Sequence, residues 1–382
     1  MIYCDYAATT PVMEDALSIY QEVARNHYGN ASSLHDVGSN AASILENARK
    51  LLAETLKTSS DAVYFTSGGT EGNLLAIDTL LRSCTGKKHV ISTIMEHSSV
   101  YYHLQHLDRA GLIEVTFLDG KRDGQIDLEE LKASIRPDTC LVSIQHVNGE
   151  TGVIQPIEQI SQLLHERKIY FHSDCVQSFG KIKIDLEKTP IDAITISSHK
   201  LFGPKGIGAI YLHPAIPLTA HPIPMNHEKG IRPGTVDVAG AAAFAYAADY
   251  MSKELATHSE HLTALKKYFV EQLQKQQIPL APVLNSDNGC PSIIGCLTET
   301  TQGDYILLEY NRYGVAISTG SACSLGQQQI PRAINPFLTN KADGKRYIRF
   351  SFSHLTTKHD LDQVLDISAR IFRRIKEEQV AQ

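Results

Sequence analysis

Short apolar runs alternate with amphipathic stretches between residues 62 and 212. Runs rich in β-branched and aromatic residues predict strands at 63–66, 89–93, 114–118, 140–145, 169–173, 193–197 and 208–212. Apolar residues at helical spacing predict helices at 71–81, 99–109, 128–134 and 157–167. Strands that alternate with helical crossovers indicate an α/β fold around a mostly parallel sheet of seven strands.

The pattern changes after this region. An alanine-rich segment at 239–250 is followed by a helical stretch to residue 276 and a passage containing proline and glycine. Short strands near Ile293 and Ile348 and a final helix from Lys358 complete the chain. We therefore expect a large domain of residues 13–250 and a smaller α+β domain formed by residues 1–12 and 251–382.

Composition narrows the possible functions. The 382 residues are 42% hydrophobic, which is enough for two cores. The formal net charge of −6 and the lack of a basic run argue against nucleic-acid binding and favour a small-molecule substrate. No run of about eighteen apolar residues predicts a membrane span, and the first residues do not read as an export signal. Seven scattered cysteines do not form a disulfide framework, so we expect a cytoplasmic location.

A stretch of small residues surrounds Cys323. It reads Ser318-Thr319-Gly320-Ser321-Ala322-Cys323-Ser324-Leu325-Gly326. Its glycines allow backbone conformations that are closed to other residues, so the stretch predicts a loop with a reachable thiol. A structural cysteine would normally have apolar neighbours. Cys323 is therefore a candidate nucleophile.

Lys200 follows the predicted strand 193–197. A partly desolvated lysine at a strand end can have its pKa lowered enough to form a Schiff base with an aldehyde cofactor. A solvated surface lysine is the ordinary alternative, and the accompanying segments favour the cofactor.

A glycine-containing turn joins the predicted strand 63–66 to the next helix. Ligands of open α/β sheets bind at the carboxyl ends of strands. Backbone N–H groups at Gly68 and Gly69 and the positive end of the helix favour a phosphate, and Thr70 adds a hydroxyl donor. The turn could also be only a tight connection. Because a Walker lysine and the dinucleotide glycine spacing are both lacking, we expect a phosphate without a nucleotide.

Two further strand ends carry candidate side chains. Asp174 could keep a pyridine nitrogen protonated and Gln177 could donate to a ring oxygen, although Asp174 could instead cap a following helix. His97 could stack on an aromatic ring and shuttle protons. The histidines and cysteines lack the company of metal ligands, so we expect no metal.

Nine segments, in this order, resemble the NifS/IscS-type cysteine desulfurases, which are pyridoxal-phosphate enzymes of the class V aminotransferase group with fold type I. They are residues 5–11, 67–73, 96–97, 146–153, 173–177, 197–206, 232–235, 318–323 and 349–351. The resemblance covers nearly the whole chain.

The resemblance implies a role for each matching residue. Lys200 would hold pyridoxal 5'-phosphate covalently, His97 would stack on its ring, and Asp174 would pair with the pyridine nitrogen. Gln177 and Asn148 would lie at the phenolic oxygen. The implied phosphate ligands are Gly69, Thr70, Ser197, His199 and, in a homodimer, the partner subunit's Thr235. Arg349 would bind the substrate carboxylate in a bidentate contact that a lysine could not reproduce, with Asn30 nearby.

The implied reaction removes sulfur from L-cysteine, leaving L-alanine and a persulfide on Cys323. An acceptor protein would take this sulfur for iron–sulfur cluster assembly, tRNA thiolation or NAD biosynthesis. Because the pKa of free cysteine is about 8.5, Cys323 needs activation, by His97 or by the cofactor. A selenocysteine lyase, a class V aminotransferase and a non-catalytic sulfur carrier are the alternatives. Cys175, Gly149 and the segment after Cys323 depart from the family pattern, but no catalytic group is missing.

Overall fold

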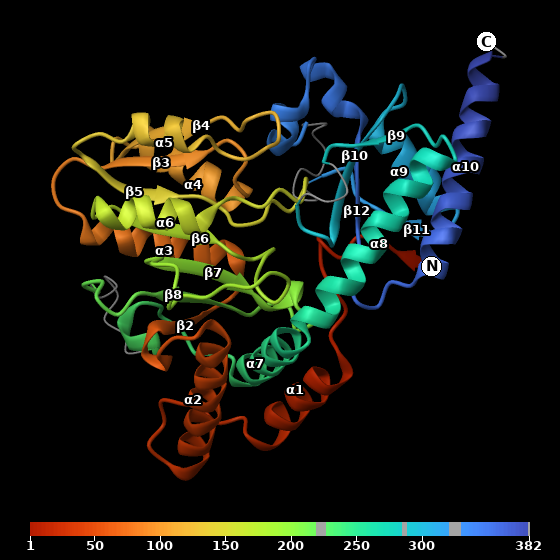
Figure 1. The fold of residues 1–382 in the computed structure, drawn as a ribbon. Coiled ribbons are helices and arrows are strands. Elements are labelled where there is room, and N and C mark those ends of the chain that lie inside the picture. The colour runs from red at the N-terminus through yellow and green to blue at the C-terminus, as the bar shows by residue number, and fades with distance from the viewer. Residues whose placement is uncertain (219–226, 285–288, 321–329, 381–382) are drawn as a thin grey trace.

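The computed structural model describes residues 1–218, 227–284, 289–320 and 330–380 (Figure 1). Its largest sheet has seven strands in the order β2-β8-β7-β6-β5-β3-β4. Their bounds are β2 Val63–Thr66, β3 His89–Thr93, β4 Glu114–Leu118, β5 Thr139–Ser143, β6 Tyr170–Asp174, β7 Ala193–Ser197 and β8 Gly208–Leu212. Strands β3 to β7 pair in parallel, and β8 is antiparallel to both β7 and β2. The expected α/β fold with a mostly parallel sheet is confirmed.

Two predicted strands are displaced. The prediction 140–145 was wrong at both ends, because Thr139 already pairs with β3 and the regular strand ends at Ser143. Gln145 lies beyond the end of the strand, and its side-chain Nε2 donates to the carbonyl of Met95. The prediction 169–173 ended one residue early, because Asp174 still pairs with Thr195 of β7.

Helices cover both faces of this sheet. The connecting helices are α3 Gly69–Ser83, α4 Ser98–Arg109, α5 Leu128–Ser134 and α6 Ile157–Glu166. Val90 of β3 packs in the core that contains α3 and α4, whereas its neighbour Ile91 packs in the core that contains α5 and α6. The period-2 alternation of the strand therefore assigns neighbouring side chains to opposite cores. Helix α3 begins two residues before the predicted helix, directly after the turn.

Three more helices contribute buried side chains to the core that contains α5 and α6. They are α1 Glu14–Asn26, α2 Asp36–Leu56 and α7 Val238–Lys253. The small residues Ala241, Ala245 and Ala248 of α7 are buried there together with Leu45 and Leu52 of α2. The alanine-rich segment is thus a helix whose small side chains allow close packing. Helices α1 and α2 were not predicted.

A further group of strands and helices lies beside the large sheet (Figure 1) and encloses a third core. Its strands are β1 Ile2–Tyr3, β9 Leu280–Pro282, β10 Ile293–Thr298, β11 Val315–Ala316 and β12 Tyr347–Ser351, and its helices are α8 Leu255–Lys275, α9 Gly303–Arg312 and α10 Lys358–Val380. The order β12-β10-β9 is antiparallel, and β1 pairs in parallel with β11. The first residues of the chain are therefore built into the C-terminal part. Short 3-10 helices occupy Ser60–Ala62, Ser198–Lys200, His227–Gly230, Arg332–Phe337 and Lys341–Arg346.

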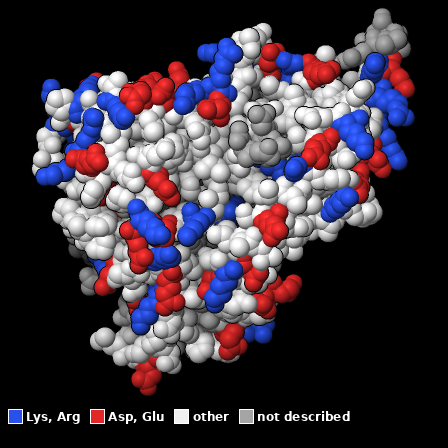
Figure 2. All heavy atoms as spheres, viewed as in Figure 1, with Lys and Arg blue, Asp and Glu red and all other residues white. Residues whose placement is uncertain are grey.

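Acidic and basic side chains are interspersed on the face shown in Figure 2. No area of a single charge sign dominates that face. Among the helices within the described ranges, none is both long and apolar enough to cross a lipid bilayer.

Candidate active site

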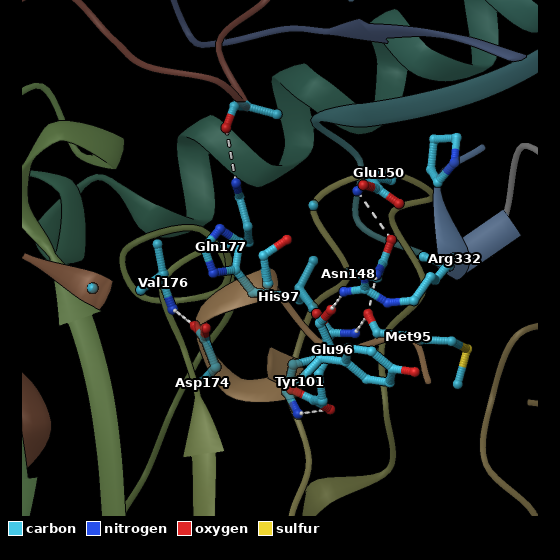
Figure 3. A pocket seen from close by; sticks show the side chains of 18 of the residues that line it. Met95, Glu96, His97, Tyr101, Asn148, Glu150, Asp174, Val176, Gln177 and Arg332 are labelled. Carbon is cyan, nitrogen blue, oxygen red and sulfur yellow. Dashed lines mark hydrogen bonds between the residues drawn. The ribbon is translucent and has the colours of Figure 1, made fainter. Parts of the chain in front are cut away.

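A cavity of about 950 Å³ opens at the carboxyl ends of the central strands (Figure 3). It gathers side chains from the start of α3, the β3–α4 turn, the end of β6, the β7 end and strand β12. Most of the predicted site residues line it, namely Gly69, Thr70, His97, Asn148, Asp174, Gln177, Ser197, His199, Lys200 and Arg349.

Two predicted site residues lie outside the lining of this cavity, and a third lies outside the described residues. Asn30 and Thr235 are exposed and lie outside its lining. Cys323 lies outside the described residues, but Gly320, three positions before it, and Ile330 both line the cavity.

Lys200 is the last residue of the short 3-10 helix that follows β7. Its Nζ donates to the main-chain carbonyls of Ala7, at 2.5 Å, and Ala8, at 2.6 Å. Burial, followed by the positive charges of Lys181 and Arg349, lowers the pKa of Lys200 to about 7. A large share of the amine is therefore neutral near pH 7, as a nucleophilic lysine requires. The surface alternative for Lys200 does not hold.

The start of α3 forms an anion-binding turn. Gly68 has a φ of +147°, and a Cβ at Gly69 would lie 2.9 Å from Cγ2 of Val176, so both positions favour glycine. The hydroxyl of Ser197 faces this turn, is buried, and has no hydrogen-bond partner within the described residues. Free N–H groups of the first helical turn and an unpartnered hydroxyl together suit a phosphate.

Asp174 lies at the tip of β6 and is 6% exposed. Its Oδ1 accepts from the amide of Val176 at 2.9 Å, and its Oδ2 accepts from Nδ2 of Asn73 at 2.7 Å. No helix begins directly after β6, so the capping alternative for Asp174 is wrong. Two neutral donors thus fix the orientation of this carboxyl group, whose oxygens are suited to accept from a ring nitrogen.

His97 is the N-cap residue of α4, and its Nδ1 accepts from the amide of Ser99 at 3.2 Å. The ring faces the cavity beside Asp174 (Figure 3). His97 is accessible from the cavity, but withdrawal of its ring from bulk water lowers its pKa, so the neutral imidazole is favoured.

Gln177 and Asn148 are largely committed to protein partners. Gln177 donates to the carbonyl of Ala7 at 2.8 Å and accepts from Nζ of Lys181 at 3.1 Å. Asn148 donates to the carbonyl of Met95 at 3.0 Å, and its Oδ1 accepts from the amide of Thr151 at 2.8 Å. Each side-chain amide nitrogen therefore keeps one N–H for a ligand.

Arg349 projects from β12 and is 5% exposed. Its Nη2 pairs with Oδ1 of Asp5 at 2.6 Å, and its Nη1 donates to the carbonyl of Gly149 at 2.8 Å. Its buried Nε has no partner within the described residues. The guanidinium thus has a charge-compensating partner and keeps several N–H groups, that of Nε among them, for a carboxylate.

Sequence reasoning missed two ionisable groups at the site. Glu96, 3% exposed, lines the cavity, and burial raises its pKa to about 8. Lys181 donates to Gln177, and burial lowers its pKa to about 8. Two signals pointed to these residues: Glu96 lies in the segment 96–97 that resembles the family, and Lys181 lies four residues after Gln177. The sequence does not show that either side chain is buried.

Cys175 and His199, which drew attention in the sequence, lie in different surroundings. Cys175 is fully buried in the core that contains α5 and α6, and burial raises the pKa of its thiol to about 12. It is therefore an unreactive core residue. His199 lines the cavity, accepts or donates at Thr9 through Nδ1 at 3.1 Å, and has a pKa lowered to about 4 by burial.

These residues fit pyridoxal 5'-phosphate. The α3 turn with the unpartnered hydroxyl of Ser197 suits the phosphate, and the amine of Lys200 suits the aldehyde. The carboxylate of Asp174 suits the ring nitrogen, and the ring of His97 offers a stacking surface.

Comparisons with known proteins agree with this chemistry. The sequence matches the family described as aminotransferase class-V over residues 2–364. It is 42% identical to a Bacillus subtilis (strain 168) protein named NifS over 369 residues, which cover 96% of this chain and 93% of the relative. It is 35% identical to the cysteine desulfurase IscS of Dictyoglomus turgidum over 381 residues, covering 98% and 95% of the two chains.

Solved structures give the same result. A structure titled NifS-like protein superposes with a TM-score of 0.90 at 27% identity, covering 97% of this chain and 99% of that chain. A structure titled SspA in complex with cysteine superposes with a TM-score of 0.80 at 30% identity, covering 92% and 99%.

The resemblance found in the sequence is thus confirmed over nearly its full length. Enzymes of this family depend on pyridoxal 5'-phosphate, and the cavity holds the groups that this cofactor needs. The chain belongs to the class-V aminotransferase family, in its NifS/IscS group of pyridoxal-phosphate-dependent cysteine desulfurases.

Proposed function

We propose that this chain removes sulfur from L-cysteine, releases L-alanine and carries the sulfur as a persulfide on Cys323. The observation that carries the proposal is the meeting of Lys200, Asp174, His97 and Arg349 in one cavity. A relative 30% identical to this chain has been solved in complex with cysteine, which supports the same substrate here.

Different residues would bind the different chemical groups of the cofactor. Gly69, Thr70, Ser197 and His199 would hold the phosphate, and Asp174 would hold the ring nitrogen in its protonated form. When bound, pyridoxal 5'-phosphate supplies an electron sink for the substrate's Cα. Gln177 and Asn148 each have one amide N–H left to orient the ring oxygen.

The substrate would be oriented by Arg349, whose Nε is unpartnered within the described residues. A guanidinium binds a carboxylate through two parallel hydrogen bonds, which fixes the position of the substrate's Cα as well as its charge. Nζ of Lys200, with a pKa of about 7, is able both to accept the α-proton and to return a proton later. Asn30 would approach the substrate from its exposed loop.

Sulfur transfer would follow from a thiolate at Cys323. Its sulfur would bond to the sulfur of the substrate while the carbon–sulfur bond of the substrate breaks. The electron pair of that bond would stay with the carbon, which takes up a proton to become the methyl group of alanine. Cys323 is oxidised to a persulfide in the same exchange, so no external oxidant is needed. Gly320 lines the cavity, and three residues span at most about 11 Å, which supports access of Cys323 to the substrate.

The finer parts of the proposal concern partners and organisation. A homodimer is supported by the exposure of Thr235, because this residue does not line the cavity of its own chain. The separate cores support a large domain of residues 13–250 and a smaller one of 1–12 and 251–382. A sulfur-acceptor protein and a cytoplasmic location are proposed together, because the described cysteines are all free thiols.

Alanine formation from L-cysteine tests the function. Loaded with pyridoxal 5'-phosphate, the wild-type protein should release alanine, whereas Cys323→Ala should not, although it should keep the visible absorption of the cofactor. Cys140→Ala, which removes a half-buried thiol outside the cavity, is the matched control and should remain active. A colourless protein with no borohydride-trapped adduct on Lys200, or parental activity of Cys323→Ala, would contradict the proposal.

The acceptor can be identified separately. L-cysteine labelled with radioactive sulfur should transfer its label first to this chain and then to a co-purifying protein. Retention of the label on Cys323 in every fraction would argue against a dedicated acceptor.

A further inference from the structure

Four side chains form a continuous hydrogen-bonded chain, and three of them, Asn73, His97 and Asp174, line the cavity. Nδ2 of Asn73 lies 2.7 Å from Oδ2 of Asp174 and 2.9 Å from Oγ of Ser99. Oγ of Ser99 in turn lies 2.8 Å from Nδ1 of His97. These contacts therefore join Asp174 and His97, two residues that line the cavity.

The direction of each bond follows from the chemistry of Asn73. This residue is 1% exposed, and its Oδ1 is buried without a partner among the described residues. Rotating the amide by half a turn would bring Oδ1 against the carboxylate of Asp174, which is repulsive. The amide N–H₂ group must therefore face Asp174 and Ser99, and it donates one hydrogen to each.

The orientation of Ser99 then fixes the protonation of His97. Since its Oγ accepts from Asn73, its hydroxyl hydrogen is free to point at Nδ1 of His97. The main-chain N–H of Ser99, which can only donate, also lies 3.2 Å from the same nitrogen. Two donors converge on Nδ1, so this atom carries a lone pair and the hydrogen of the ring is on Nε2.

We propose that Ser99, oriented by Asn73, is a positioning residue that holds His97 as a neutral imidazole with its hydrogen on Nε2. This inference rests on the proposed function only for the cofactor that His97 faces. In this form the ring can stack on the cofactor and donate from Nε2. It cannot accept a proton at Nδ1 without losing both contacts with Ser99. Activation of the Cys323 thiol by His97 as a base is therefore disfavoured.

The surrounding charges act on His97 in both directions. Burial has the largest effect and lowers its pKa, as do the positive charges of Lys200 and Arg332, whereas Asp174 raises it. A hydrogen bond to the neutral form lowers the pKa of a histidine further, so loss of the Ser99 hydroxyl should raise it. One hydrogen bond corresponds to a rise of roughly 0.5 to 1 pH unit.

Nitrogen-15 NMR of histidine-labelled protein tests the inference, in the apoprotein and after loading with pyridoxal 5'-phosphate. The signals of His97 are those that disappear in His97→Gln. The wild type should show an unprotonated Nδ1 and a protonated Nε2 at pH 7. Ser99→Ala should raise the pKa of His97 by roughly 0.5 to 1 unit, and Asn73→Leu should raise it by less.

Ser99→Thr keeps the hydroxyl and should restore the wild-type titration. Ser98→Ala removes a neighbouring hydroxyl that is not part of the chain, so the signals of His97 should not change. A wild-type ring protonated on Nδ1, or an unchanged titration in Ser99→Ala, would overturn the inference. These results do not depend on turnover, so a protein that shows the predicted signals but forms no alanine would contradict only the proposed function.

Discussion

Nζ of Lys200 donates a 2.5 Å hydrogen bond to the carbonyl of Ala7, a residue 193 positions earlier in the sequence. The same N-terminal segment supplies Ala8 to Lys200, Asp5 to Arg349 and a second contact of Ala7 with Gln177. The segment 5–11 is thus part of the site, because β1 ties the start of the chain to β11 beside the cavity.

Removing the charge of Lys181 should make Lys200 harder to deprotonate. The positive charge of Lys181 is the largest electrostatic cause, after burial, of the lowered pKa of Lys200. With a pKa of about 7, half of the wild-type amine is neutral at pH 7, and this fraction rises as the pH increases. Lys181→Met should move this titration upward by about one unit.

The pH dependence of Lys200 labelling by an amine-reactive reagent, measured by mass spectrometry on the apoprotein, checks this shift. Lys183→Met removes an exposed lysine nearby and serves as the control. Identical titrations in wild type and Lys181→Met would show that the charge of Lys181 does not lower the pKa of Lys200.

Asp174→Asn should weaken binding of pyridoxal 5'-phosphate by roughly 10- to 100-fold, because a neutral amide replaces a charge-assisted hydrogen bond. The new amide would also face the donor of Asn73. Equilibrium titration of apoprotein with the cofactor measures the affinity, and urea unfolding of the apoprotein reports any loss of fold. Undiminished affinity in a folded variant would remove Asp174 from the cofactor site.

Arg349→Lys should raise KM for L-cysteine by about tenfold or more and lower kcat less, because an ammonium cannot make the bidentate contact. Steady-state alanine formation at varied L-cysteine gives both constants. Arg346→Lys, which changes an arginine outside the cavity, is the matched control and should have wild-type KM. A wild-type KM in Arg349→Lys would mean that another residue binds the carboxylate.

Glu96→Gln should make folding stability less dependent on pH. Burial raises the pKa of Glu96 from 4.5 to about 8, so between these values the folded protein holds a proton that the unfolded chain has lost. Stability attributable to Glu96 is then fully present below pH 4.5 and falls as the pH rises toward 8, by up to about tenfold in the folding equilibrium per pH unit. The neutral glutamine lacks this dependence.

Urea unfolding of both apoproteins at pH 5, 6.5 and 8 measures the difference. The variant should gain stability relative to wild type as the pH increases. Glu158→Gln, at an exposed position of α6, should follow the wild-type curve. If Glu96→Gln and wild type differed in unfolding free energy by the same amount at all three pH values, the pKa of Glu96 would not be raised in the folded protein.

Local patterns predicted the parts of the fold that have regular side-chain periods. Strands such as β2 and β7 are short apolar runs with clear ends, and their bounds were correct. Helix α2 was missed because its buried face includes polar Arg49. Buried Arg49 forms a double hydrogen bond at 2.8 Å with Glu228, which lies 179 positions away, and also donates to the carbonyl of Val63.

In the candidate site too, some residues could be predicted from local sequence patterns and others could not. Asp174, His97 and Lys200 follow strands, so the parallel topology placed them at one edge of the sheet. The roles of Glu96 and Asn73 depend on how deeply their side chains are buried and on the direction of their hydrogen bonds. Local sequence patterns do not show either property. Partners such as Ala7 with Lys200 depend on contacts between distant segments.

The most direct test of the whole account follows the sulfur atom itself. Enzyme loaded with pyridoxal 5'-phosphate would be mixed with L-cysteine, stopped within one turnover by alkylation, digested and analysed by mass spectrometry. The account predicts one additional sulfur atom on the peptide containing Cys323 and one alanine per active site. Alanine formed without added sulfur on Cys323, or sulfur found on another cysteine instead, would contradict it.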